Sequence, residues 1–195
     1  MNRPTGMPFN FPIFLTWLRI AVIPLLVGIY YVPDTIFTMY EKNLIATILF
    51  VSAAATDWLD GYLARKWGQS SNFGAFLDPV ADKLIVAAAL LVLLNFDRVQ
   101  VWVAIIIIGR EITISALREW MALMGASASV AVHFLGKVKT TMQLIAVSFL
   151  LYDGPILGVP CRQIGHVFIV IAALLTLWSM FYYLQKAKQV IIEKG

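Results

Sequence analysis

Four aspartates in the first half of the chain have the residue type and the spacing to bind metal ions. Asp57 and Asp60 lie near the end of one apolar run, and Asp78 and Asp82 lie near the start of the next. At about 100° per residue, a helix would place each pair of carboxylates on one face. Hard divalent cations prefer such oxygen ligands, and two of these cations about 3.5 to 4 Å apart suit phosphoryl chemistry. The spacing therefore predicts a metal site.

The structural alternative for these acids is that they cap helix ends and pair with Arg65, Lys66 and Lys83 near the membrane interface. Asp78 followed by Pro79 is typical of an N-cap and a first helical position, so we expect a helix to begin there. Capping does not account for Asp57 and Asp60, because both precede the end of a hydrophobic run. Each carboxylate at the centre of a membrane span costs about 2.5 to 3.5 kcal/mol on the insertion scale, so the set needs a positive partner.

The composition indicates a membrane protein. Of the 195 residues, 61% are hydrophobic and 13% are charged, and the mean hydropathy is +0.82. A spanning helix needs about 20 apolar residues. Apolar stretches of nearly that length or more occupy residues 12–32, 43–64, 79–96, 99–117, 130–152 and 164–184. We therefore expect an all-α polytopic membrane protein with six transmembrane helices, in a single domain over residues 1–195.

The basic residues predict the orientation of these spans. The connections at 33–42, 95–98 and 153–163 hold three cations, whereas eleven lie in or beside the N-terminus, the second and fourth connections and the C-terminus. By the positive-inside rule, both termini are expected to be cytoplasmic.

The cysteine and histidine content limits the possible metal chemistry. A single cysteine, Cys161, excludes a disulfide within the chain and a thiolate cluster, and His133 and His166 lack zinc-type spacing. A metal ion must therefore bind to oxygen ligands. The net charge of +4 fits basic cytoplasmic loops, and no nucleic-acid partner is expected.

The four acids belong to a longer pattern. It reads D-x-x-D-G-x-x-A-R, eight residues, then G-x-x-x-D-x-x-x-D, and its other fixed positions are Gly61, Ala64, Arg65 and Gly74. This pattern resembles the signature of the CDP-alcohol phosphotransferases, with every fixed position matched. The stretches 109–120 and 136–141 are similar to the bacterial branch that uses glycerol 3-phosphate, and the resemblance covers nearly the whole chain. The chain departs from many family members in having Pro12-Ile13, rather than Pro-Asn, before its Leu-Thr pair.

The resemblance implies an enzyme of the bacterial inner membrane, with its active site facing the cytoplasm and commonly a homodimer. Such an enzyme transfers the phosphatidyl group of CDP-diacylglycerol to sn-glycerol 3-phosphate and releases CMP. By the resemblance, Asp57, Asp60 and Asp78 would hold two Mg2+ or Mn2+ ions. Asp82 would share a metal ion and remove the proton of the acceptor hydroxyl as the catalytic base. The four other fixed positions would contact the CDP-lipid: Gly61, Ala64, Arg65 and Gly74.

Four basic residues in the second half are candidates to bind the acceptor phosphate. Arg110 follows a run of isoleucines, and an arginine inside a membrane span indicates function by default. Arg118 lies eight residues on, and Lys137 and Lys139 open the fifth expected span, so all four could converge on one phosphate. Alternatively, Arg110 pairs with a nearby acid such as Glu111, and the other three only anchor the topology.

Two other functions remain open at this point. A different acceptor, such as serine or inositol phosphate, would keep the four aspartates and change only the basic pocket. A cation transporter could also use intramembrane acids, but it gives no reason for the spacing of Gly61, Ala64 and Arg65.

Overall fold

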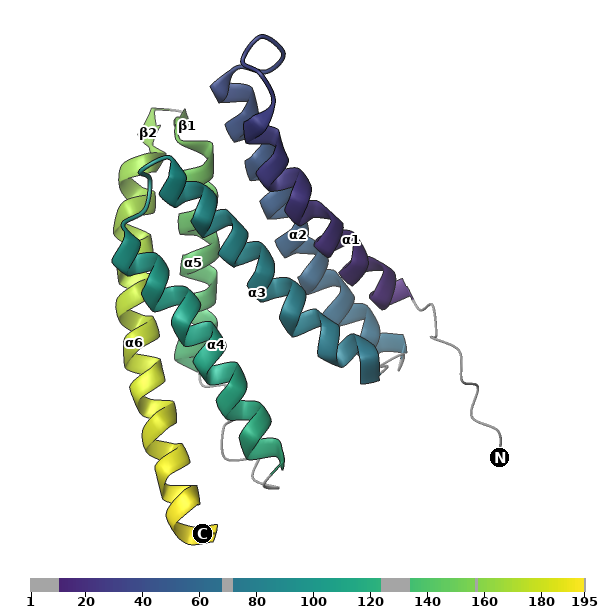
Figure 1. The fold of residues 1–195 in the computed structure, drawn as a ribbon, viewed down its shortest axis with the longest axis vertical. Helices are drawn as coiled ribbons and strands as arrows, with labels where there is room; N and C mark the ends of the chain where they lie inside the picture. The colour runs from purple at the N-terminus through teal and green to yellow at the C-terminus, as the bar shows by residue number, and fades with distance from the viewer. Residues whose placement is uncertain (1–10, 68–71, 124–133, 157, 195) are drawn as a thin grey trace. The chain divides into compact units, whose positions relative to one another are not determined.

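The computed structural model describes residues 11–67, 72–123, 134–156 and 158–194. Within these ranges, side chains are not described at 11–13, 58–67, 72, 73, 75, 134–137, 186, 187 and 189–194. The described part of the chain contains six α-helices, one 3-10 helix and a short β-hairpin (Figure 1). The mostly helical fold confirms the all-α expectation apart from that hairpin. The chain forms two compact units, residues 1–89 and 90–195, each with its own packing.

The N-terminal unit is built on two helices that lie side by side. It contains α1 (Phe11–Gly28), η1 (Ile29–Tyr31), α2 (Met39–Trp67) and most of α3 (Asn72–Asn95). α1 and α2 pack against each other side by side (Figure 1). Leu26 of α1 and Ala46 and Phe50 of α2 are buried in this unit. The packing places the polar residues of α1 near the motif acids that follow on α2.

Reciprocal hydrogen bonds fix the start of α2. The Thr38 hydroxyl accepts the Glu41 N–H at 3.4 Å, and Oε2 of Glu41 accepts the Thr38 N–H at 2.7 Å and its hydroxyl at 2.8 Å. This is a capping box. The backbone N–H of Thr38, followed by its hydroxyl, lowers the pKa of the Glu41 carboxyl below its ordinary value. The cap sets the register of the helix that carries Asp57 and Asp60.

The start of α3 corrects one expectation from the sequence. α3 begins at Asn72, so Asp78 is not an N-cap and Pro79 lies inside the helix rather than at its first position. Proline removes one helical hydrogen bond, and membrane helices tolerate that loss where neighbouring groups satisfy the freed carbonyl. The chain thus reaches Asp78 already helical, and Asp78 and Asp82 lie one turn apart on α3.

In the C-terminal unit, two long helices pack against α6. The unit contains α4 (Val101–Leu123), α5 (Phe134–Tyr152), β1 (Pro155–Ile156), β2 (Val159–Pro160) and α6 (Cys161–Lys194), together with the end of α3. α6 packs against α5 and α4 (Figure 1). The antiparallel hairpin pairs Ile156 with Val159, and Gly158 adopts a positive φ of 84° in its turn, which favours glycine. Cys161, at the start of α6, is only 1% exposed.

Arg98 connects two loops of the C-terminal unit. Its Nη1 donates to the carbonyl oxygens of Leu150 at 3.2 Å and Leu151 at 3.0 Å, and its Nε lies 3.1 Å from Oδ2 of Asp153. The last carbonyls of a helix have no partner within that helix, so this buried guanidinium caps α5. The α3–α4 and α5–α6 connections therefore meet at one end of the unit.

The expected membrane spans are confirmed in part. Two windows in the described residues are long and apolar enough to cross a bilayer, Phe14–Tyr31 and Cys161–Gln185, and Val138–Tyr152 is apolar but shorter. α4 carries Arg110, Glu111 and Arg118 within its length, which lowers its mean hydropathy. The apolar helices indicate a membrane protein, while the six-span count and the cytoplasmic termini stay predictions.

Candidate active site

An arginine of α1 brings two motif acids together in the N-terminal unit. Nη1 of Arg19 lies 2.6 Å from Oδ1 of Asp82 on α3 and 3.4 Å from Oδ1 of Asp57 on α2. The Arg19 side chain is 1% exposed, whereas both carboxylates are about half-exposed. One guanidinium nitrogen therefore compensates the charges of two acids that come from different helices.

A second residue of α1 contacts the third described acid of the motif. The Thr16 hydroxyl donates to Oδ1 of Asp78, and Thr16 itself is buried. Thr16 and Arg19 are three residues apart, so they share one face of α1. This face of the helix meets the expected metal-binding residues of α2 and α3.

The structure gathers part of the predicted acidic site. Asp57 and Asp82 converge on Arg19, and Asp78 is held by Thr16. Asp60, Gly61, Ala64 and Arg65 lie on α2, but their side chains are outside the described part. Gly74 is buried in the first turns of α3. Among the residues whose side chains are described, no three acids, histidines or cysteines form a group that could hold a metal ion.

The donor set nevertheless suits a hard divalent cation. All the side chains that the motif contributes here are carboxylates, and two of them approach a common cationic nitrogen. Carboxylate oxygens are the ligands that such a cation binds, although in this structure the positive charge between Asp57 and Asp82 is the Arg19 guanidinium.

Sequence reasoning did not select Thr16 or Arg19. Both lie within the first apolar stretch, where an ionisable residue indicates function by default. That rule was applied to Arg110 and would equally have found Arg19. Thr16 carried no comparable signal, because hydroxyl residues commonly form hydrogen bonds between membrane helices.

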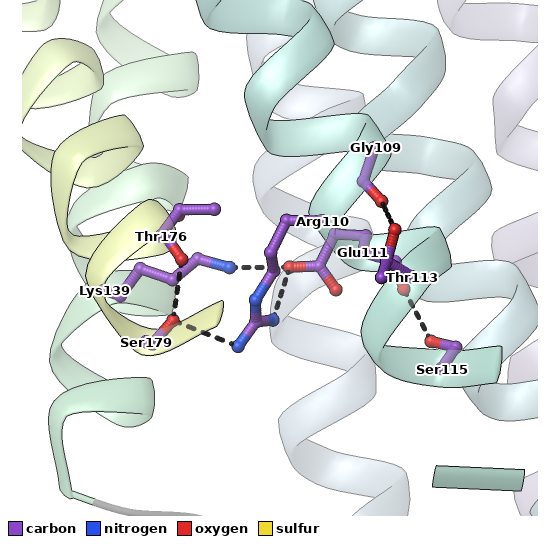
Figure 2. Close-up of polar contacts among 8 residues, drawn as sticks. All are labelled: Gly109, Arg110, Glu111, Thr113, Ser115, Lys139, Thr176 and Ser179. Atoms are coloured by element: carbon purple, nitrogen blue, oxygen red, sulfur yellow. Dashed lines mark hydrogen bonds and ion pairs between the residues drawn. The ribbon is translucent and has the colours of Figure 1, made fainter. Parts of the chain in front are cut away.

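A second polar cluster lies inside the C-terminal unit, around Arg110 of α4. Its Nη1 is 3.2 Å from Oε1 of Glu111, and its Nη2 donates to the Ser179 hydroxyl of α6 at 3.3 Å (Figure 2). Nζ of Lys139 on α5 reaches the same Glu111 oxygen at 2.6 Å. Arg110 and Lys139 are both buried. Three helices thus contribute to one charged cluster.

The sequence left two interpretations of these basic residues, phosphate binding or a purely structural role, and the contacts distinguish them only in part. Arg110 does pair with Glu111, as the structural alternative held. Lys139 is not a solvated anchor, because it is buried and shares that carboxylate. Arg118 is exposed, and its guanidinium lies over the Tyr183 ring. Lys137 lies on α5 with its side chain outside the described part.

The sequence did not predict a functional role for Ser179 and Tyr183, which contact these cations. Ser179 and Tyr183 lie in the long apolar run of α6, where a serine and a tyrosine are ordinary packing residues. Only the packing of α6 against α4 reveals their contacts.

Comparison with known proteins identifies the class of enzyme. A model of the CDP-alcohol phosphatidyltransferase family matches residues 9–178. The chain belongs to this family. CDP-alcohol phosphatidyltransferases use divalent metal ions. The carboxylates that meet at Arg19 are the type of ligand that such ions bind.

Three relatives that align with nearly the whole chain share one name. A protein of Haemophilus influenzae named CDP-diacylglycerol--glycerol-3-phosphate 3-phosphatidyltransferase is 46% identical over 190 residues, covering 96% of this chain and 98% of its own. Proteins with the same name from Escherichia coli K12 and Shigella flexneri serotype 5b are each 47% identical over 191 residues, covering 96% of this chain and all of theirs. This phosphatidyltransferase is therefore similar to bacterial enzymes along nearly its whole length.

Proposed function

We propose that this phosphatidyltransferase transfers the phosphatidyl group of CDP-diacylglycerol to sn-glycerol 3-phosphate, giving phosphatidylglycerophosphate and CMP. The observation that carries this proposal is the identity of 46% to 47% with relatives of that name along nearly the entire chain. The Arg110–Glu111–Lys139 cluster, whose two cations are buried, supports the choice of acceptor, because a phosphate monoester supplies an anionic ligand for such cations.

The donor is assigned to the motif on α2 and α3. Asp57, Asp60, Asp78 and Asp82 would hold two Mg2+ or Mn2+ ions. When bound, these ions would stabilise negative charge on the attacking and leaving oxygens. Thr16 and Arg19 hold three of the four carboxylates in place. Gly61, Ala64, Arg65 and Gly74 would contact the CDP part of the donor.

Asp82 is assigned as the base. It takes the proton of the acceptor hydroxyl while that oxygen forms a bond to the phosphatidyl phosphorus, and the bond from this phosphorus to CMP breaks. The ion pair with Arg19 fixes the orientation of the Asp82 carboxylate, which this transfer requires. Four cations are assigned to the phosphate of the acceptor: Arg110, Arg118, Lys137 and Lys139.

The cellular setting belongs to the same proposal. The enzyme would lie in the bacterial inner membrane with six spans and a site facing the cytoplasm, surrounded by membrane lipids. The relatives are bacterial and the apolar helices support membrane insertion. The homodimer that the family resemblance implies stays a prediction.

The proposal is tested by supplying purified protein with labelled CDP-diacylglycerol, Mg2+ or Mn2+, and separate acceptors. Glycerol 3-phosphate should give labelled phosphatidylglycerophosphate and CMP, and glycerol, serine and inositol phosphate should give little product. Product with serine or inositol phosphate alone would assign a different acceptor within the family. Ion flux in proteoliposomes without CMP release would favour the transporter.

A further inference from the structure

Two arginines of the proposed acceptor site lie against one aromatic ring. The guanidinium carbon of Arg110 is 5.9 Å from the centroid of the Tyr183 ring, and that of Arg118 is 5.7 Å from the same centroid. Both distances are within about 6 Å, the range of cation–π attraction. Tyr183 lies on α6 and is only 2% exposed. The ring is therefore a common contact of two cations from another helix.

The spacing on α4 explains how one ring reaches both arginines. Arg110, Ile114 and Arg118 follow at intervals of four residues, so they share a face of the helix. Ile114 is buried and belongs with Tyr183 and Met121 to one apolar cluster. Tyr183 thus packs on the middle of this face, with an arginine one turn away on each side.

The helix backbone alone would keep these arginines apart. Eight residues of α-helix correspond to about 12 Å along the axis, which is too far for two guanidinium groups to reach one phosphate without turning toward each other. Attraction to a ring between them supplies a reason for both side chains to turn inward. Ser179, one turn before Tyr183 on α6, also accepts a hydrogen bond from Arg110.

This mode of contact leaves N–H donors of both arginines for an anion, although one N–H of Arg110 already points to Glu111 and another donates to Ser179. A ring attracts the face of a guanidinium, whereas the N–H donors that bind phosphate project from its edges. Tyr183 and the phosphate would therefore occupy different sides of the same groups.

We infer that Tyr183 is a positioning residue of the acceptor site, whose ring holds Arg110 and Arg118 so that both guanidinium groups converge on the phosphate of glycerol 3-phosphate. This inference rests on the proposed function. It adds a residue of α6 that the family motif does not contain.

The test compares variants that keep or remove the ring. Tyr183→Phe keeps it and Tyr183→Leu removes it, while Phe181→Leu removes an aromatic side chain of the same helix that is 65% exposed. We expect Tyr183→Leu to raise the apparent KM for glycerol 3-phosphate about tenfold, with the KM for CDP-diacylglycerol changed less than about twofold. Tyr183→Phe and Phe181→Leu should stay within about threefold of the parent for both substrates.

Two further measurements separate positioning from packing. A fluorinated phenylalanine at position 183 keeps the shape of the ring but weakens its negative face, so it should raise the KM for glycerol 3-phosphate above that of Tyr183→Phe. It serves equally if Tyr183→Leu does not fold. In a protein that already carries Arg110→Ala and Arg118→Ala, Tyr183→Leu should raise the KM for glycerol 3-phosphate little further. The effects of residues that act through one another are not additive.

Each outcome has a defined meaning. If Arg110→Ala raises the KM for glycerol 3-phosphate while neither Tyr183→Leu nor the fluorinated ring does, the inference fails and the proposed function stands. If Arg110→Ala also leaves that KM unchanged, the acceptor site itself is wrongly assigned. If every Tyr183 variant raised the KM for both substrates equally, the ring would serve only to pack α6 against α4, and the inference would be overturned.

Discussion

The Arg19 guanidinium and the Asp82 carboxylate form an ion pair of 2.6 Å between α1 and α3. Because the same nitrogen also reaches Asp57, Arg19 compensates charge on both helices of the motif. Converging carboxylates repel one another unless a cation lies among them. Arg19 therefore has a role in the folded enzyme that precedes any bound metal ion.

Replacing Arg19 should expose this role. Arg19→Ala removes a buried cation and is expected to cost about 1 to 3 kcal/mol of stability, because charged hydrogen-bond partners are left behind. Divalent metal should then raise the unfolding midpoint more than it does in the parent protein, since it replaces the missing charge. Thermal unfolding with and without Mn2+ measures both effects. Arg162→Ala, which removes a half-exposed partner of Asp153, is the control. Equal metal responses in parent and variant would remove charge compensation as the function of Arg19.

Replacing different acids of the motif should impair different properties of the enzyme, either metal binding or turnover. Asp57→Asn and Asp60→Asn each remove a charged oxygen ligand, so metal affinity and metal-dependent binding of CDP-diacylglycerol should both fall. Asp82→Asn should keep part of its donor binding while turnover falls by about 10^2 to 10^4, the usual contribution of a general base. Metal titrations of donor binding, paired with rates of CMP release, separate the two cases. Near-normal turnover in Asp82→Asn would exclude it as the base, and complete loss of donor binding would make it chiefly a metal ligand.

The basic cluster of the C-terminal unit should affect the binding of the acceptor and leave the binding of the donor unchanged. Arg110→Ala and Lys139→Ala each remove a charged contact to phosphate, so the apparent KM for glycerol 3-phosphate should rise about 10- to 100-fold. The KM for CDP-diacylglycerol should change little. Lys188→Ala, an exposed cation on α6, is the matched control. Unchanged acceptor kinetics in both cluster variants would contradict the phosphate site.

The orientation of the chain needs introduced cysteines. Cys161 is buried, so its failure to react with a thiol reagent would say nothing about its side of the membrane. On a Cys161→Ala background, Gln163→Cys should react with an impermeant reagent in intact spheroplasts, whereas Ala122→Cys should react only after the membrane is opened. Both positions are exposed in the structure. The opposite labelling pattern would reverse the proposed orientation.

The residue pattern predicted the helices more completely than it predicted the contacts between them. Apolar runs located all six α-helices, and the motif acids do lie on α2 and α3, because hydrophobic length is encoded locally. The start of α3 was wrong because Asp78-Pro79 has the local form of a helix beginning. Thr16, Ser179 and Tyr183 were missed because their partners lie on other helices, more than sixty residues away for Thr16 and Ser179.

The contacts of Arg98 can form only late in the synthesis of the protein. Its acceptors on α5 lie 52 and 53 residues downstream, so the ribosome completes Arg98 well before either of them. Until then the guanidinium must remain with water or headgroups, because an unpaired charge is costly in a membrane. The last turn of α5 then supplies two carbonyls, and Asp153 directly after it supplies the carboxylate. A nascent chain that stops before the end of α5 therefore leaves Arg98 without these contacts, and the α3–α4 connection without its link to α5.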